Sequence, residues 1–411
     1  MAINDSGGAS YGGASGLGTL DAVLKEVYEA RIRDQLNNEV VALRRIERTS
    51  EGVTSQVGGK YVVFPIHISR NSGIGARLED EDLPTPGAQG YRRAQVNLRY
   101  QYGRLRLTGQ AIELARENFQ AFASAMDEEM RRLKDDLAKD LNRQVYGDGL
   151  GTVAKISGAL SGSTAPVDGT LYVQEGMVVD TGTVSNGVFT PVATNKVVSN
   201  VDVANGEIDL TGGTGTPANG HTIVRAGNGR TADDEQREWT GLGALVGTDE
   251  LFGITHPKWA SVIDDNGGTP RALSESLIIL NADAVRVNGS YPTVMFTNLG
   301  VRRAYFNLLT QQRRFTNTQT FEGGFSGLAF TTDKGDIPMV VDTDCPLGTL
   351  YGLNEKEIKV YRDADWSFMD RDGSRWARVP NRDAYEATMY QYSELGTHRR
   401  NAHFKIADIQ E

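Results

Sequence analysis

The feature that most constrains this chain is the stretch from Thr108 to Gly147, whose pattern predicts one unusually long helix. Its apolar residues recur every three or four positions, so on a helix they form a single stripe. They are Ile112, Ala115, Phe119, Phe122, Met126, Met130, Leu133, Leu137, Leu141 and Val145. We expect Thr108 to act as the N-cap and Gly147 as the glycine that ends the helix.

Such a helix is roughly 50 Å long, more than a compact domain needs for its own core. One narrow apolar stripe on a long polar rod is typical of a beam laid across a thin layer. The simpler alternative is an ordinary long helix packed on a globular core.

Length and composition bound the class of protein. A chain of 411 residues predicts two or three domains, and 47 glycines indicate many tight turns. The 43 Lys and Arg against 53 Asp and Glu give a net charge of −10, which argues against a dedicated nucleic-acid binder. Cys345 is the single cysteine, so no intrachain disulfide forms and a reducing compartment fits. Without a signal-peptide pattern or an 18-residue apolar run, the sequence predicts a soluble, intracellularly made α and β protein.

The N-terminal part of the chain has the composition of an arm. Residues 1–18 are rich in Gly, Ser and Ala, which predicts a flexible segment. A helix should follow, because apolar residues recur there at every fourth position: Leu20, Leu24, Tyr28, Ile32 and Leu36. The segment from Glu39 to Arg48 also has a helical pattern.

Two predicted strands enclose a long acidic loop. Lys60 to Ser69 is rich in strand-forming residues, and its Pro65 favours an edge strand or a bulge. Ala94 to Leu107 alternates apolar and polar residues, the pattern of a half-exposed strand. The connection is rich in Gly and Pro and carries the acidic run Glu79, Asp80, Glu81 and Asp82. Loops of this length are normally functional or disordered, so we expect a long hairpin with a floppy, polar tip.

Residues 151–235 have a different character from both flanks. Short β-branched runs alternate with the turn dipeptides Asn186-Gly187, Asn205-Gly206 and Asn219-Gly220. This pattern predicts a small all-β barrel or sandwich inserted after the long helix.

Helices and strands mix in the remainder of the chain. The patterns predict helices at Leu273–Val287 and Val301–Arg314. They predict strands at Thr293–Thr297, Ser326–Thr331, Ile337–Asp342, Thr349–Leu353 and Asp383–Ser393.

No arrangement of residues predicts catalysis, a metal or a cofactor. The five histidines are scattered, with no helix-spaced pair to bind a metal ion. Gly8 to Gly12 matches a nucleophile-elbow pattern, but no predicted strand precedes it. Cys345 has no basic neighbour in sequence, which favours a structural thiol. We therefore expect a protein that is not an enzyme and has no cofactor.

The order of these parts resembles the major capsid protein family of tailed bacteriophages, which has the Hong-Kong-97-type shell fold. Four segments carry the resemblance: Thr108-Gly109-Gln110-Ala111-Ile112-Glu113, Asp140-Leu141-Asn142-Arg143-Gln144-Val145-Tyr146-Gly147-Asp148-Gly149, Asp342-Thr343-Asp344-Cys345-Pro346 and Arg400-Asn401-Ala402-His403. They are specific in combination rather than singly. The resemblance covers nearly the whole chain except residues 151–235.

The resemblance implies an α+β shell fold with a defined order of domains. These are an N-terminal arm (1–50), an extended E-loop (51–107), the P-domain spine helix (108–150), an inserted β domain (151–235), P domain (236–284), A domain (285–380) and a return to the P domain (381–411). The implied function is structural. Pentamers and hexamers of the protein would form an icosahedral shell, assembled in the host cytoplasm, around double-stranded phage DNA that is enclosed without sequence-specific contacts.

The implied partners are further copies of the chain and scaffolding, portal and decoration proteins, with no membrane. Two alternatives stay open: an encapsulin, which uses the same fold as a cellular compartment, and an adhesion or sugar-binding protein acting through residues 151–235. That segment has only Tyr172 and Phe189 as aromatic residues, a poor platform for stacking sugar rings.

The acidic tip of the E-loop is the candidate contact between subunits. We expect Glu79, Asp80, Glu81 and Asp82 to bind a basic patch on a neighbouring subunit. The candidate basic residues are Arg302, Arg303, Arg313 and Arg314. The alternative is a solvated tip that contacts nothing.

Overall fold

The computed structural model describes residues 40–50, 53, 61–110, 113, 119–185, 187–230, 236–313, 329–332, 334–370 and 376–411. The chain forms two compact units. The first contains Arg99–Trp239 and Ala364–Tyr392, and the second contains residues 40–98, Thr240–Asp363 and Ser393–Glu411. The arm and the arm helix expected before residue 40 lie outside the described residues.

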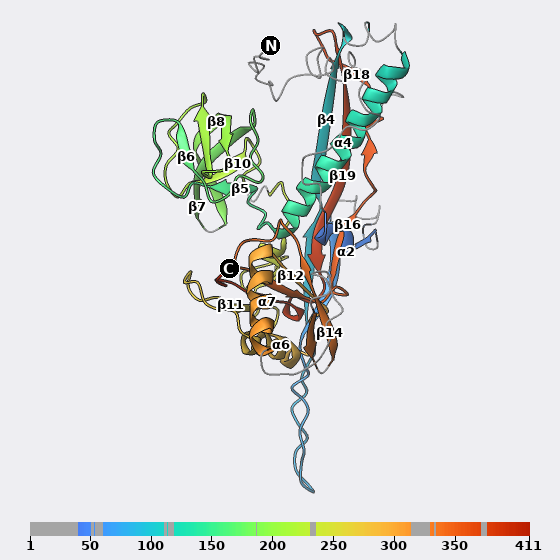
Figure 1. Ribbon diagram of the computed structural model, residues 1–411. Helices are drawn as coiled ribbons and strands as arrows, with labels where there is room; N and C mark the ends of the chain where they lie inside the picture. Colours follow the sequence, from blue (N-terminus) through green and yellow to red (C-terminus); the bar gives the residue numbers. More distant parts are fainter. Residues whose placement is uncertain are drawn as a thin grey trace. The chain divides into compact units, whose positions relative to one another are not determined.

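Helices and strands are mixed along the chain, as expected for an α+β fold (Figure 1). In order they are α2 (Ala42–Arg45), β1 (Glu47–Thr49), β2 (Tyr61–Ser69), β3 (Gly90–Asn97), β4 (Arg99–Thr108), α4 (Phe119–Tyr146), β5 (Thr152–Lys155), β6 (Thr164–Pro166), β7 (Val178–Ser185), β8 (Val188–Asp202), β9 (Glu207–Thr211), β10 (Thr222–Arg225), α5 (Leu242–Leu245), β11 (Val262–Asp264), α6 (Glu275–Val287), β12 (Val294–Thr297), α7 (Leu299–Arg313), β13 (Ala329–Thr332), β14 (Gly335–Val341), β15 (Leu350–Leu353), β16 (Ile358–Arg362), β17 (Ser367–Phe368), β18 (Ala377–Arg378), β19 (Ala384–Thr397), the 3₁₀ turn η4 (Arg400–Ala402) and β20 (Phe404–Ile406).

Helix α4 in the first unit is the long helix expected from the sequence. The apolar stripe is buried at its C-terminal end, at Leu141 and Val145. Strand β4 approaches the helix closely at Gly103, where an added side chain would require the Leu137 side chain to move. A Cβ atom on Gly103 would lie 2.6 Å from Leu137 Cδ1. The helix therefore packs along strand β4.

Both ends of the helix differ from the expectation. Thr108 is the last residue of β4 instead of an N-cap, and helical backbone starts at Gly109. Because strand β4 continues through Thr108, this residue is part of the strand and is not the N-cap of the helix. Gly147 follows the helix, but its φ is not positive, and its N–H donates to the Gln144 carbonyl oxygen at 3.1 Å in a tighter turn. The left-handed glycine is Gly149, with φ of 81°.

Six strands of the first unit form a small barrel. The sheet order is β5-β10-β7-β8-β9-β6. Its two ends meet, because Ile156 bridges to Val167 and the Ser157 N–H donates to the Pro166 carbonyl oxygen at 2.9 Å. The interior is aliphatic and includes Val153, Ile156, Val179, Val198, Ile208, Leu210 and Ile223. A closed six-stranded sheet agrees with the expected barrel or sandwich.

The second unit contains a mixed sheet in the order β11-β20-β15-β12-β14-β13. The pairs β12–β14 and β11–β20 are parallel, and the other described pairs in this sheet are antiparallel. Helices α6 and α7 pack on this sheet around one apolar core, which includes Ile278, Val285, Met295, Val301, Met339, Leu350 and Phe404. The sequence predicted both helices and the strands β12–β15, with ends shifted by up to three residues.

Two segments were predicted as single elements and are divided in the structure. The expected helix from Glu39 to Arg48 is helical only at Ala42–Arg45, and Glu47–Thr49 then pairs with β16 in parallel. The expected strand from Ala94 to Leu107 breaks at Leu98 into β3 and β4. Each strand belongs to a different unit.

The break at Leu98 exchanges the buried face of the strand. Before it the even-numbered residues Ala94, Val96 and Leu98 are buried, and after it the odd-numbered Gly103 and Leu107 are buried. Because side chains alternate along a strand, a one-residue change of phase turns the opposite face inward.

Candidate inter-subunit site

Strands β2 and β3 pair as an antiparallel hairpin that is anchored by its base in the second unit. Val62, Ala94 and Val96 on the hairpin are buried. They belong to apolar clusters that contain Tyr361 and Trp259 of the same unit. Packing against the second unit therefore fixes the base of the hairpin, and the rest of the hairpin extends from this base.

Beyond the paired strands, the two sides of the hairpin continue next to each other through residues 70–89. A Cβ atom on Gly73 would lie 2.9 Å from the backbone nitrogen of Gly87 across the hairpin, so this close approach requires glycine. The Gly73 N–H donates to Asn71 Oδ1 at 2.7 Å. Figure 1 shows the segment as a long, narrow, twisted projection at the bottom of the view.

The acidic tip is an ordered turn rather than the floppy segment expected from the sequence. The Leu78 N–H donates to Glu81 Oε2 at 2.9 Å, and the Glu81 N–H donates back to the Leu78 carbonyl oxygen at 3.4 Å. Asp80 lies in the left-handed region with φ of 65°, which a short polar side chain tolerates. Arg77 Nε donates to the Asp82 carbonyl oxygen at 2.7 Å. The carboxylate of Glu81 therefore stabilises the turn, and Arg77 stabilises it further.

The same projection exposes large apolar side chains to solvent. Ile74, Leu78 and Leu83 are 83%, 77% and 85% exposed. Exposed apolar groups that gather at one place mark binding surfaces in folded proteins. These residues were not predicted as contact residues, because the composition of the loop indicated a polar tip. The signal that could have identified them is the presence of apolar residues in a Gly- and Pro-rich loop. Such a loop has no hydrophobic core in which these residues could be buried.

The predicted contact residues lie in two places. Glu79, Asp80, Glu81 and Asp82 are all exposed at the hairpin tip. Arg302 and Arg303 are in α7, where Arg302 is half-buried and Arg303 is exposed. Arg313 ends α7, and its side chain and Arg314 lie outside what the structure describes. The expected contact between the tip of one subunit and an arginine pair of another stays a prediction.

A second feature is a buried cluster of charges between the end of α4 and the barrel. Arg143 Nη2 lies 2.7 Å from Glu238 Oε2, and Arg143 Nε lies 3.1 Å from Asp140 Oδ1. Arg225 at the end of β10 lies 2.9 Å from the same Asp140 oxygen. Arg143 Nη1 also donates to the Thr152 carbonyl oxygen at 2.9 Å. Arg143 therefore joins the long helix to the first strand of the barrel and to Glu238, and Asp140 joins the helix to the last strand through Arg225.

Electrostatics explain how these charges can stay buried. Burial alone would raise the pKa of Asp140, but the charges of Arg143 and Arg225 outweigh it and lower that pKa to about 2. Burial would likewise lower the pKa of Arg143, but Asp140 and Glu238 raise it above its usual value. The side chains of Arg143 and Glu238 are only 6% and 5% exposed. The cluster is thus stable only when all its members are present.

The described residues bear on the expectations for a metal site, a membrane helix and the single thiol. Among them, no three His, Cys, Asp or Glu side chains are placed to hold a metal ion. In the same residues, no helix is long and apolar enough to cross a membrane. Burial, with Asp342 adding to it, raises the pKa of the Cys345 thiol, which donates to the Thr349 carbonyl oxygen at 3.7 Å. This is the environment expected for a structural thiol.

The structure contains a projecting hairpin, a long helix packed along a strand and a mixed sheet with two helices, a combination that invites comparison with shell proteins. Residues 220–410 match the family model of the SU10 major capsid protein. The resemblance to phage major capsid proteins drawn from the sequence is therefore confirmed. Among curated protein sequences, none matches this chain.

A solved structure supports the capsid shell fold. The chain is similar to the capsid protein of cyanophage A-1(L), at 15% identity and a TM-score of 0.53 over 95% of this chain and 98% of that one. It also matches the capsid of Myoviridae phage XM1 (9% identity, 93% and 97% coverage, TM-score 0.47). A third match is the SrpI encapsulin of Synechococcus elongatus (8% identity, 100% and 97% coverage, TM-score 0.41). The fold assignment rests on the first of these.

Proposed function

We propose that this protein is a phage major capsid protein whose copies form pentamers and hexamers and then an icosahedral shell. The shell would assemble in the host cytoplasm and enclose double-stranded DNA without reading its sequence. The net charge of −10 supports a container, because a wall that bound DNA tightly would hinder its release.

The observation that carries this proposal is the hairpin tip. Ile74, Leu78 and Leu83 project from the hairpin around a hydrogen-bonded turn, and they are exposed in the part of the chain that the structure describes. Their exposure to water is unfavourable in an isolated subunit. Burial of these side chains against another subunit would therefore favour association. The shell fold offers such neighbours in a repeated, symmetric arrangement.

The domain assignment follows the same proposal. We assign residues 1–50 to the N-terminal arm, 51–107 to the E-loop, 108–150 to the spine, 151–235 to an inserted domain, 236–284 and 381–411 to the P domain and 285–380 to the A domain. The closed barrel between β5 and β10 supports the inserted domain. Scaffolding, portal and decoration proteins are the further partners in this proposal.

Substituting the exposed leucines should separate assembly from folding. In Leu78→Ser/Leu83→Ser subunits, we expect an unchanged far-ultraviolet circular dichroism spectrum and melting temperature, because neither side chain is packed in the subunit. Shell formation should need at least about tenfold more protein, since burying a leucine contributes about 1.5–3 kcal/mol. Light scattering and electron microscopy measure this threshold.

A matched control is Val203→Ser. Val203 is 74% exposed on the barrel and is not part of the hairpin. This variant should assemble as the unmodified protein does. Equal loss of assembly in both variants would contradict a specific role for the hairpin tip.

The function itself is tested by electron microscopy of the purified protein together with analysis of its contents. Closed shells that contain double-stranded DNA when produced during phage growth are the expected result. Particles filled with a protein cargo would support a cellular compartment instead. A protein that stays monomeric at every concentration would refute the proposal.

A further inference from the structure

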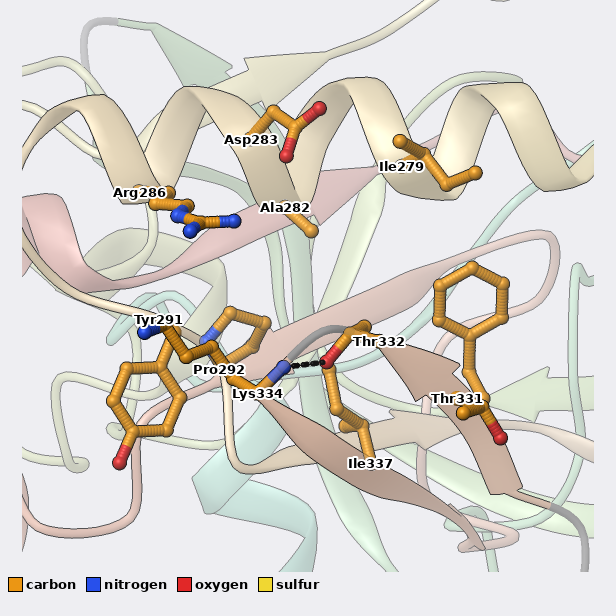
Figure 2. A pocket seen from close by; sticks show the side chains of 11 residues that line it. Ile279, Ala282, Asp283, Arg286, Tyr291, Pro292, Thr331, Thr332, Lys334 and Ile337 are labelled. Atoms are coloured by element: carbon orange, nitrogen blue, oxygen red, sulfur yellow. Dashed lines mark hydrogen bonds between the residues drawn. The ribbon is translucent and has the colours of Figure 1, made fainter.

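A pocket in the second unit lies between helix α6 and the β13–β14 hairpin (Figure 2). Its volume is about 240 Å³, larger than a cavity of about 150 Å³ that admits benzene. Ala282 from the helix and Phe330 and Ile337 from the strands give it an apolar lining. The pocket is therefore large enough to receive a leucine side chain.

Charged side chains surround this apolar lining. Asp283 and Arg286 come from α6, and Lys334 comes from the hairpin. Figure 2 shows Arg286 and Asp283 on the helix above the pocket, with Ile337 on the strand below it. Ile279, beside the pocket on α6, is 47% exposed. The site thus combines an apolar interior with two cations and one carboxylate.

The tip of the β2–β3 hairpin has the complementary pattern. Leu78 and Leu83 project from the turn, and four carboxylates with one arginine, Arg77, surround them. Leu78 and Leu83 are 77% and 85% exposed, so the pocket of the same subunit does not bury them. A second copy can supply the missing surface.

We propose that the pocket between α6 and β13–β14 binds the hairpin tip of another copy of this chain. Leu78 or Leu83 enters the apolar lining, and the exposed carboxylates of Glu79 and Asp82 face Arg286 and Lys334. Two different surfaces meet in this contact, so it is heterologous and joins subunits into rings. The inference rests on the proposed shell function and names the surface that receives the tip.

This pocket fits the tip better than the arginines of α7 do. Arg302 and Arg303 contribute charge, and exposed ion pairs contribute only about 0–1 kcal/mol each. The pocket adds burial of a leucine, which contributes about 1.5–3 kcal/mol. The apolar contribution therefore favours the pocket.

Cysteine cross-linking between two subunit populations tests the contact directly. One population carries Leu78→Cys and the other carries Thr331→Cys, an exposed residue that lines the pocket. The two populations are assembled together, oxidised and analysed in detergent without reductant. We expect a disulfide-linked dimer in the mixed shells and none in shells made from either population alone. Native Cys345 is buried and should not react.

A third population carrying Arg303→Cys is the rival. A dimer between Leu78→Cys and Arg303→Cys, with none to Thr331→Cys, would overturn the proposal in favour of α7. Normal mixed shells without either dimer would also overturn it, while leaving the shell function intact. If the unmodified protein forms no shells at all, the proposed function fails and the docking contact fails with it.

Charge exchange gives an independent readout. Arg286→Glu/Lys334→Glu should lower shell yield while leaving the circular dichroism of the subunit unchanged. Adding Glu79→Lys/Asp82→Lys to the same chain should restore part of the yield. These two tip residues are chosen because Glu81 builds the turn and must stay. A quadruple variant that assembles no better than the pocket variant would contradict the pairing.

Discussion

Replacing Arg143 with Met should destabilise the subunit by about 3–5 kcal/mol, because it leaves Asp140 and Glu238 buried without their partner. The Arg143 guanidinium contacts both carboxylates and a backbone carbonyl oxygen, so no other group can replace all three contacts. Urea unfolding followed by tryptophan fluorescence measures the loss. Methionine retains a long apolar side chain, so the experiment removes the charge and keeps most of the packing.

Arg131→Met on the same helix is the matched control. Arg131 pairs with Asp135 at 3.2 Å, but its side chain is 60% exposed. An exposed pair of this kind contributes at most about 1 kcal/mol. Similar losses in the two variants would show that the buried cluster does not hold the helix and barrel together.

Acidification should destabilise the second unit through His403. This side chain is fully buried, and burial lowers its pKa to about 3. Its Nδ1 accepts a hydrogen bond from the Asn354 N–H at 3.2 Å, an acceptor role that protonation would abolish. The unfolded chain binds a proton near its ordinary pKa of about 6.5. The stability that the neutral His403 contributes is therefore fully present above pH 6.5 and is lost progressively as the pH falls towards 3.

The expected loss is about 2 kcal/mol between pH 6.5 and pH 5, at about 1.4 kcal/mol per pH unit. Urea unfolding at pH 7 and pH 5 measures it. His403→Gln should be less stable at pH 7 but should show a flatter pH dependence. His398, whose pKa is also lowered by burial, accounts for part of the remaining slope. A variant at His403 with an unchanged slope would refute this assignment.

The periodic parts of the fold could be predicted from the sequence because their apolar spacing reports local geometry. Helices α6 and α7 and strand β2 end within two residues of the predicted positions, α4 lies within its predicted range, and β19 extends four residues beyond its predicted end at Ser393. The break at Leu98 could not be predicted in this way. Tyr100 and Tyr102 continue the apolar rhythm of β3 in the sequence, yet they are 49% and 51% exposed on β4. Which face is buried there depends on the neighbouring helix.

The candidate site was predictable only in part. The acidic run from Glu79 to Asp82 was evident, but the turn built by Glu81 depends on hydrogen-bond geometry. The cluster at Arg143 was hidden for another reason. Glu238 lies 95 residues further along the chain, so no local pattern links the two side chains. Long-range ion pairs and exposed apolar residues become visible only when the chain is folded.

The closed barrel of β5–β10 has a consequence for crowding. An open sheet presents unpaired N–H and C=O groups along its edges, and a neighbouring sheet can add to them and start aggregation. Here the bridge between Ile156 and Val167 joins the two ends of the sheet. If each copy in a shell carries one such barrel, the barrels are held at very high local concentration. Closure would then let them lie next to one another without strand exchange.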